Sequence, residues 1–200
     1  MFPLGTVLLP SFPLELQVFE PRYQALVRHC LAGEREFGVV LIERGSEVGG
    51  DDVRTEVGTV AHITHAVERP GGRWTIGAVG VRRLRVLSWL ADDPYPRAEV
   101  EDWPDAPLGQ GSEATLERTI ARLRQTLALA AEAGDAVAPA TIALSEDVGL
   151  ASHQAVGLAP VGPFDRHRLL GAPSPDARLE GLDALLVEAI EVLQLRLAEG

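Results

Sequence analysis

The stretch that most constrains the fold is residues 12–23, Phe-Pro-Leu-Glu-Leu-Gln-Val-Phe-Glu-Pro-Arg-Tyr. Leu14, Leu16 and Val18 alternate with polar residues, which is the period of a half-buried strand. Pro21 suits the first position of a helix, where its missing N–H is harmless. Glu20 before it places a negative charge at the positive end of the helix dipole. The stretch therefore predicts a strand that ends in a corner and is followed by a helix.

Short strands dominate the rest of the first half. The corner's helix is predicted over 21–31, with Gly33 as its C-terminal cap. A polar, glycine-rich surface loop is predicted over 45–54, and Arg69-Pro70-Gly71-Gly72 predicts a turn between two antiparallel strands. The predicted strands are 6–9, 12–18, 37–42, 57–67, 74–79, 84–88 and 97–101. Several short strands at this spacing, with one early helix, indicate a small β-barrel.

The second half is predicted to be helical. Residues 102–111 hold prolines and glycines and predict a linker, so we expect one domain over 1–108 and another over 109–200. Ser112 is expected to cap a helix that ends near Gly134, and Ser174-Pro175 to open a long last helix. Two shorter helices are predicted, one from Ser145 to about Ala155 and one over 163–170. The predicted fold class is α+β, a barrel followed by a C-terminal α-helical bundle.

Four sequence blocks in the first half resemble the N-terminal, substrate-binding domain of Lon proteases. They are Phe19-Glu20-Pro21-Arg22-Tyr23, Phe37-Gly38-Val39-Val40-Leu41, Val57-Gly58-Thr59-Val60-Ala61 and Gly80-Val81-Arg82-Arg83-Leu84-Arg85-Val86. The resemblance implies a PUA-like barrel, and the helical half resembles the bundle that follows it in bacterial Lon proteins. It also implies a free-standing version of the domain, without the ATPase and peptidase that follow it in Lon.

The composition excludes several kinds of chemistry. All 18 basic residues are arginine, so no Schiff base, no P-loop lysine and no Ser–Lys dyad is possible in this sequence. The formal net charge of −11 argues against binding a phosphate backbone. The single cysteine fits a reducing cytoplasm, and no apolar run reaches the ~20 residues of a membrane span.

Patterns that suggest catalytic or ligand sites have simpler explanations. Gly109-Gln110-Gly111-Ser112-Glu113-Ala114 fits a dinucleotide-binding pattern, but prolines stand where a buried strand should precede it, so a linker is the better interpretation. His62 and His65 would point to opposite faces of a strand and could not share a metal ion. Cys30 falls on the apolar face of its helix and is expected to pack as a small hydrophobic residue. No catalytic residue, metal site or cofactor is predicted.

The family-motif positions Phe19, Glu20, Arg22, Tyr23 and Arg83 are the candidate site residues, with either a structural or a binding role. Arg22 in the first helical turn is unfavourable for the dipole, which suggests a specific acidic partner. We expect Glu20 to accept a hydrogen bond from an arginine, with Arg83 as the first candidate, and Tyr23 to be largely buried. The basic cluster Arg82, Arg83 and Arg85 is expected to be structural.

The leading functional hypothesis is a non-catalytic module that binds exposed apolar segments of unfolded or partner proteins. The resemblance implies this role, because the matching region of Lon helps to select protein substrates. The expected partners are client proteins, with a protease or chaperone among them, and neither a membrane nor a nucleic acid. Two alternatives stay open, a PUA-like module that binds a small molecule or RNA and an unrecognised hydrolase.

Overall fold

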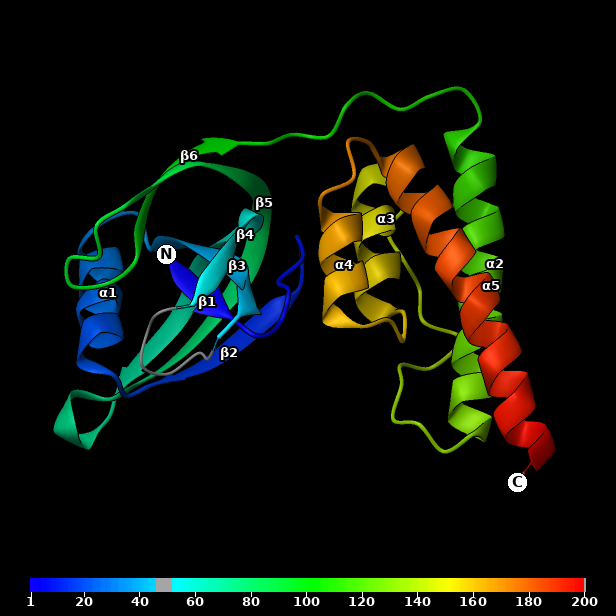
Figure 1. The fold of residues 1–200 in the computed structure, drawn as a ribbon, viewed down its shortest axis with the longest axis horizontal. Helices are drawn as coiled ribbons and strands as arrows, with labels where there is room; N and C mark the ends of the chain where they lie inside the picture. The colour runs from blue at the N-terminus through cyan, green and yellow to red at the C-terminus, as the bar shows by residue number, and fades with distance from the viewer. Residues whose placement is uncertain (46–51, 200) are drawn as a thin grey trace. The chain divides into compact units, whose positions relative to one another are not determined.

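The structure, a computed structural model, describes residues 1–45 and 52–199. The chain folds as two compact units, one ending at Pro104 and one beginning at Asp105, the first rich in strands and the second helical (Figure 1). The first contains β1 (Phe2–Leu4), β2 (Pro13–Val18), α1 (Pro21–Ala32), β3 (Glu36–Arg44), β4 (Val53–Glu68), the short 3-10 helix η1 (Pro70–Gly72), β5 (Trp74–Leu90) and β6 (Arg97–Asp102). The second contains α2 (Ser112–Glu132), α3 (Val148–Leu158), α4 (Pro163–Leu170) and α5 (Pro175–Glu199). The predicted α+β class is confirmed.

The strands form one open, curled sheet in the order β1-β3-β4-β5-β2, with β6 pairing to the far part of β5. β1 runs parallel to β3, and the other pairs are antiparallel. The first and last strands of this path border the same core, because Phe2 and Leu4 of β1 pack in one cluster with Leu14 and Val18 of β2. The sheet therefore curls as a barrel does. Among the described residues, β1 and β2 are joined by side-chain packing and not by backbone hydrogen bonds.

The first strand is not where the sequence pattern placed it. The predicted strand over 6–9 is wrong, and β1 is Phe2–Leu4, paired with Val39, Val40 and Leu41. Leu8 and Leu9 are nevertheless buried. The carbonyl of Leu8 accepts a hydrogen bond from the buried Thr59 hydroxyl at 2.7 Å. Residues 6–9 are therefore apolar because they belong to a buried connecting segment and not to a strand. The short strand before them was not predicted because it contains Pro3, and proline is uncommon within strands.

The strands predicted over 74–79 and 84–88 are one strand, β5. Gly80, which lies between the two predicted strands, pairs with Ala61 of β4 and is part of the ladder, beside a bulge at Val81 of β5. A Cβ at this position would come within 2.3 Å of the Leu9 carbonyl oxygen. Glycine is therefore required there because the backbone of another segment approaches closely, and not because the strand ends.

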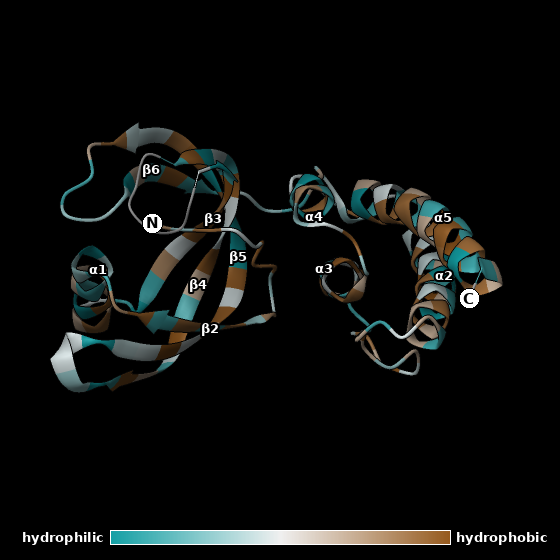
Figure 2. Cartoon of the chain, turned by 60° about the horizontal axis from the view of Figure 1, so that its bottom comes forward, coloured by the Kyte–Doolittle hydropathy of each residue, from teal (hydrophilic) through white to brown (hydrophobic). Residues whose placement is uncertain are grey.

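The second unit is built on α2 and α5, which lie side by side (Figures 1 and 2). Hydrophobic and hydrophilic bands alternate along both helices, as amphipathic helices require (Figure 2). Ser174 accepts a hydrogen bond from the Ala177 amide at 3.2 Å, as predicted for the start of α5. Two predicted caps are displaced. Gly111 precedes α2 and Ser112 is its first residue, while Asp147 rather than Ser145 caps α3 by accepting from Leu150 at 2.7 Å.

Two sequence predictions are only partly addressed by the structure. The loop predicted over 45–54 lies mostly outside the described residues, with β4 beginning at Val53. The division into two domains between residues 108 and 109 stays a prediction. Within 1–45 and 52–199, no helix is both long enough and apolar enough to cross a membrane.

Candidate functional site

The motif corner is built as its sequence predicts, except for its ion pair. Glu20 precedes α1 in an extended conformation and makes no side-chain cap, and Pro21 opens the helix. The Glu20 carboxylate instead accepts a hydrogen bond from Nε of Arg22 at 3.1 Å, with both side chains 19% exposed. Arg22, unfavourable for the helix dipole, therefore has the specific acidic partner that its position suggested.

The prediction that Arg83 is the partner of Glu20 is wrong, because Arg22 forms this ion pair. Trp74, at the start of β5, pairs with Val18 beside the corner. Arg83 lies further along β5, on the order of 30 Å away along the strand. There it is buried and its guanidinium stacks 4.6 Å from the ring centroid of Trp103. The sequence could not show this separation, because it predicted two short strands in place of one long one.

Tyr23 is a core residue, as predicted. It is 4% exposed, and its ring stacks on Phe2 with centroids 4.2 Å apart. The Arg22 guanidinium lies 4.6 Å from the same ring's centroid. Burial raises the pKa of the Tyr23 phenol to about 12, so the side chain stays neutral at physiological pH. The Tyr23 ring of α1 therefore packs α1 against Phe2 of β1.

A narrow groove of about 180 Å³ runs between β1 and β2 beside the corner. We call it the seam groove. Its lining residues are Phe2, Leu4, Glu15, Leu16, Gln17, Val18, Phe19, Glu20 and Tyr23. Phe19, at the end of the groove, is 55% exposed although it is a large apolar side chain. Its backbone carbonyl is fixed by the Gln24 side-chain amide at 2.8 Å. The groove thus brings together Phe19, Glu20 and Tyr23 of the candidate set.

The arginine side chains clustered on β5 form ion pairs with acidic residues and stack on the ring of Trp103. Arg82 donates to Glu36 at 2.8 and 2.9 Å and to Asp102 at 2.9 Å. Arg85 lies 3.7 Å from Glu101, and its guanidinium stacks 4.2 Å from the centroid of Trp103, the ring that Arg83 also contacts. The cluster is therefore arranged to tie strands together rather than to present a cationic surface to phosphates.

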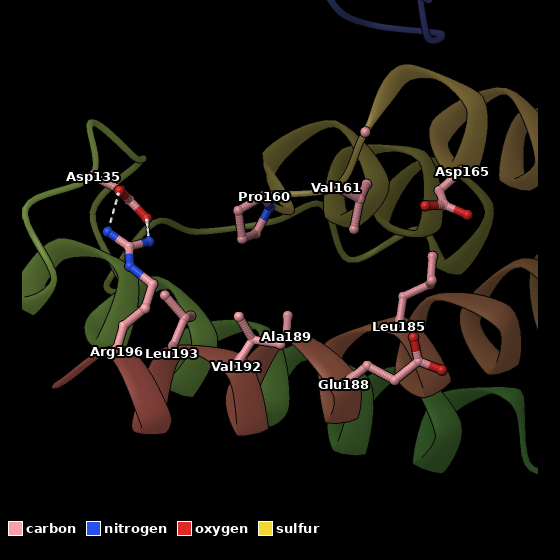
Figure 3. A pocket seen from close by; sticks show the side chains of 11 residues that line it. Asp135, Pro160, Val161, Asp165, Leu185, Glu188, Ala189, Val192, Leu193 and Arg196 are labelled. Atoms are coloured by element: carbon pink, nitrogen blue, oxygen red, sulfur yellow. Dashed lines mark hydrogen bonds and ion pairs between the residues drawn. The ribbon is translucent and has the colours of Figure 1, made fainter. Parts of the chain in front are cut away.

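The second unit carries a larger groove of about 340 Å³ along one side of α5 (Figure 3). We call it the helical groove. In Figure 3, Pro160 and Val161 face a ridge of α5 side chains across the opening, with the Asp135–Arg196 ion pair at one end and Asp165 and Glu188 at the other. The ridge is formed by Leu185, Glu188, Ala189, Val192, Leu193 and Arg196. The groove has apolar walls and charged ends.

Sequence reasoning missed the helical groove, although one signal was available. The apolar surface of α5 extends further around the helix than one buried stripe. Val187, Val192 and Leu195 are all exposed, Val192 by 58%. An amphipathic helix that packs on one side only needs a single apolar stripe, so apolar residues outside the stripe point to a second contact surface.

The remaining titratable residues form no metal site of three or more ligands in the described part of the chain. No group of three or more His, Cys, Asp or Glu side chains is close enough there to hold a metal ion. The Cys30 thiol donates to the Glu36 carbonyl at 3.2 Å and packs against the core, as its position on α1 predicted, and burial raises its pKa. His29 is hydrogen-bonded to the Tyr95 hydroxyl.

Comparison with known proteins gives consistent results. The family model for the ATP-dependent protease La (LON) substrate-binding domain matches residues 1–188. Lon protease 2 of Herpetosiphon aurantiacus is 27% identical over 195 residues, which cover 96% of this chain and 24% of that protein. The Lon protease of Syntrophomonas wolfei is 26% identical over 198 residues, 98% of this chain and 24% of that protein. The chain thus spans about a quarter of the length of the curated relatives it matches.

Two solved structures share the fold. The Lon N-terminal domain protein from Xanthomonas campestris superposes with a TM-score of 0.63 at 27% identity, covering 92% of this chain and 95% of that one. The N-terminal domain of the Mycobacterium avium complex Lon protease superposes with a TM-score of 0.65 at 18% identity, covering 94% of this chain and 96% of that one. Both alignments include most of the strand-rich unit and of the helical unit.

Proposed function

Because this chain belongs to the LON substrate-binding domain family, we propose that it is a non-catalytic recognition module for exposed apolar segments of unfolded or partner proteins. The family supports a role in substrate recognition, and the physical chemistry of the grooves supports the apolar ligand. The expected partners are client proteins, with a protease or chaperone among them. The acid-paired arginines of β5 and the net charge of −11 support a protein rather than a nucleic-acid ligand.

The helical groove is the observation that carries this proposal. Val192, more than half exposed, stands on a groove wall with Ala189 and Leu193, and Pro160 and Val161 form the facing wall. Exposed apolar surface of this kind costs free energy in water, and a bound apolar side chain would recover about 25 cal/mol for each Å² that it covers. The charged ends would then fix the direction of the bound segment.

We further propose that the chain works in the cytoplasm. Its single cysteine, half-buried and hydrogen-bonded, fits a reducing compartment. Unfolded clients of a Lon-type system are expected in the same compartment.

The test uses a permanently unfolded protein, reduced and carboxymethylated α-lactalbumin, labelled for fluorescence anisotropy. We expect the full chain to bind it and Val192→Glu to weaken binding roughly tenfold, because the new carboxylate would be desolvated against an apolar segment. Val192 is exposed, so the substitution should leave the melting temperature near that of the wild type.

Leu195→Glu is the matched control. Leu195 lies on the same helix, is 64% exposed and does not line the groove. The expected pattern is weakened binding for Val192→Glu and unchanged binding for Leu195→Glu. Equal binding by both variants, or no binding by the wild type, would contradict the proposal.

A further inference from the structure

The outer edge of β2 is open. β2 stands at the end of the sheet path and pairs only with β5 among the described residues. In an antiparallel pair, alternate residues direct their N–H and C=O groups away from the partner strand. β2 therefore presents a row of backbone donors and acceptors on the side opposite β5.

The seam groove follows this edge. Its lining includes every residue from Glu15 to Phe19 in succession. Successive side chains of a strand point to opposite faces, so consecutive residues can border one groove together only along the strand's edge. Phe2 and Leu4 of β1 border the groove but are almost fully buried in the core. The accessible apolar side chains of the groove are the half-buried Leu16 and the exposed Phe19 at its end.

We propose that the edge of β2 in the seam groove binds an extended segment of an unfolded protein as an added strand. This rests on the proposed function only in taking a protein as the ligand, since it concerns a different unit and a different contact. Backbone hydrogen bonds to β2 hold the segment without regard to its sequence. Apolar side chains on one of its faces lie against Leu16 and Phe19.

Charge at the edge selects the occupant. Glu15 lies midway along β2, its side chain is exposed, and its carboxylate lies 3.8 Å from Nε2 of His65. A basic residue on the added strand would form a favourable cross-strand pair with Glu15. A second copy of β2 would instead bring two Glu15 carboxylates near each other, and Pro13 would offer it no N–H. An apolar segment with basic residues therefore fits this edge better than another copy of the chain.

Among the described residues the sheet has two further edges, β1 and β6. β1 is three residues long, pairs only with β3 and borders the same groove, whereas β6 pairs only with β5 and carries mainly exposed side chains. No residue of β6 lines the seam groove or the helical groove. β2 is therefore the longer of the two edges that border the seam groove, and β6 supplies an internal control.

The experiment uses the full chain and a fluorescein-labelled octapeptide of alternating valine and lysine. Two further versions carry backbone N-methyl groups on alternate residues, so that in each version one edge of the extended peptide loses its donors. We expect the unmodified peptide to bind, and methylation of one edge to weaken binding roughly tenfold or more through the loss of two or three hydrogen bonds, while methylation of the other edge has little effect. Amide hydrogen exchange should slow in β2 and not in β6.

A charge exchange tests the position. Glu15→Arg should weaken the valine–lysine peptide and strengthen a valine–glutamate peptide, whereas Glu101→Arg on β6 should do neither. Both positions are exposed, so neither substitution should prevent folding. Equal binding of the two methylated peptides, protection of β6 in place of β2, or no binding of the unmodified peptide at millimolar concentration would each overturn the proposal. Binding of unfolded α-lactalbumin, sensitive to Val192→Glu, would in each case remain as a separate result for the proposed function.

Discussion

Tyr23 stabilises the corner through its ring. The side chain is buried and stacks on Phe2, so Tyr23→Ala should reduce the free energy of unfolding by ~3–5 kcal/mol, as for other buried aromatic residues. Tyr23→Phe keeps the stacking and serves as the matched control. Urea unfolding of the three proteins measures the difference. If Tyr23→Ala instead unfolds like the wild type but loses client binding, the residue is part of a recognition surface.

Glu20→Ala should reduce the free energy of unfolding by less than the loss of a fully buried ion pair would. Glu20 and Arg22 are each about one-fifth exposed and lie two positions apart, so Arg22 can turn toward water when its partner is removed. We expect a loss of about 1 kcal/mol, between the values for exposed and buried pairs. The same urea experiment measures it, and a loss as large as that of Tyr23→Ala would contradict this ranking.

The buried Arg178 is the most consequential residue of the second unit that the sequence did not reveal. It is fully buried, and its guanidinium donates to both carboxylate oxygens of Asp105, at 2.6 and 3.2 Å. It also donates to the Ser152 hydroxyl at 2.7 Å and to the Leu169 carbonyl at 3.2 Å. Nothing in the local pattern distinguishes Arg178 from the surface arginines, because its partners come from distant parts of the chain.

Asp105→Ala should destabilise the second unit by ~3–5 kcal/mol, because it leaves a buried guanidinium without its carboxylate. The matched control is Asp135→Ala, which breaks the exposed pair with Arg196 and should leave stability unchanged. Thermal unfolding followed by circular dichroism at 222 nm reports on the helices. Equal effects of the two substitutions would show that the Arg178 network contributes no more than a surface pair.

At the scale of elements, one ion-pair network links three strands. Arg82 on β5 reaches across to Glu36 on β3 and to Asp102 on β6. Hydrogen bonding from the Arg82 guanidinium, together with its charge, holds the pKa of the Glu36 carboxyl below its ordinary value of 4.5. The carboxylate therefore contributes stability that is fully present above pH 4.5 and is lost as the pH falls through the lower folded-state value.

Arg82→Gln should remove this part of the acid sensitivity. The Glu36 pKa, followed by NMR titration, is expected to rise toward its ordinary value, and stability should fall less steeply as the pH is lowered below 4.5. Because Glu36 is partly exposed, raised salt should weaken the wild-type effect as well. An unchanged Glu36 titration in Arg82→Gln would exclude Arg82 as the cause of the lowered pKa.

The elements also show what the sequence could predict. The helices α1, α2, α4 and α5 were predicted within about two residues, because proline, serine and glycine mark their ends and apolar spacing marks their length. Strands were predicted less well, because a strand depends on partners elsewhere in the chain. Gly58 and Gly80 show the difficulty, since a Cβ at these positions would come within 2.1 and 2.3 Å, respectively, of a carbonyl oxygen of another segment. The corner was predictable locally, whereas both grooves join segments that are far apart in sequence.

At the scale of the whole molecule, the connection between the units is anchored at both ends. The Trp103 amide donates to the Arg83 carbonyl in the first unit, and the Ala106 amide donates to the Pro173 carbonyl in the second. Leu108 beyond these anchors is 51% exposed. Limited proteolysis with a protease of low specificity should therefore cut first near Leu108. The other site expected from the sequence is the polar, glycine-rich stretch 45–54. Early cuts within α5 would contradict the helical assignment, and mass spectrometry of the fragments locates the sites.

The open edge of β2 has a consequence for many molecules in one solution. At neutral pH the net charge of −11 makes copies of the protein repel one another. Pro13 and Glu15 also disfavour pairing between the β2 edges of two copies. Near the isoelectric point of about 4.9 the long-range repulsion disappears. Copies can then approach one another, and what opposes the pairing of two β2 edges is no longer the net charge but the missing N–H of Pro13 and the side chain of Glu15.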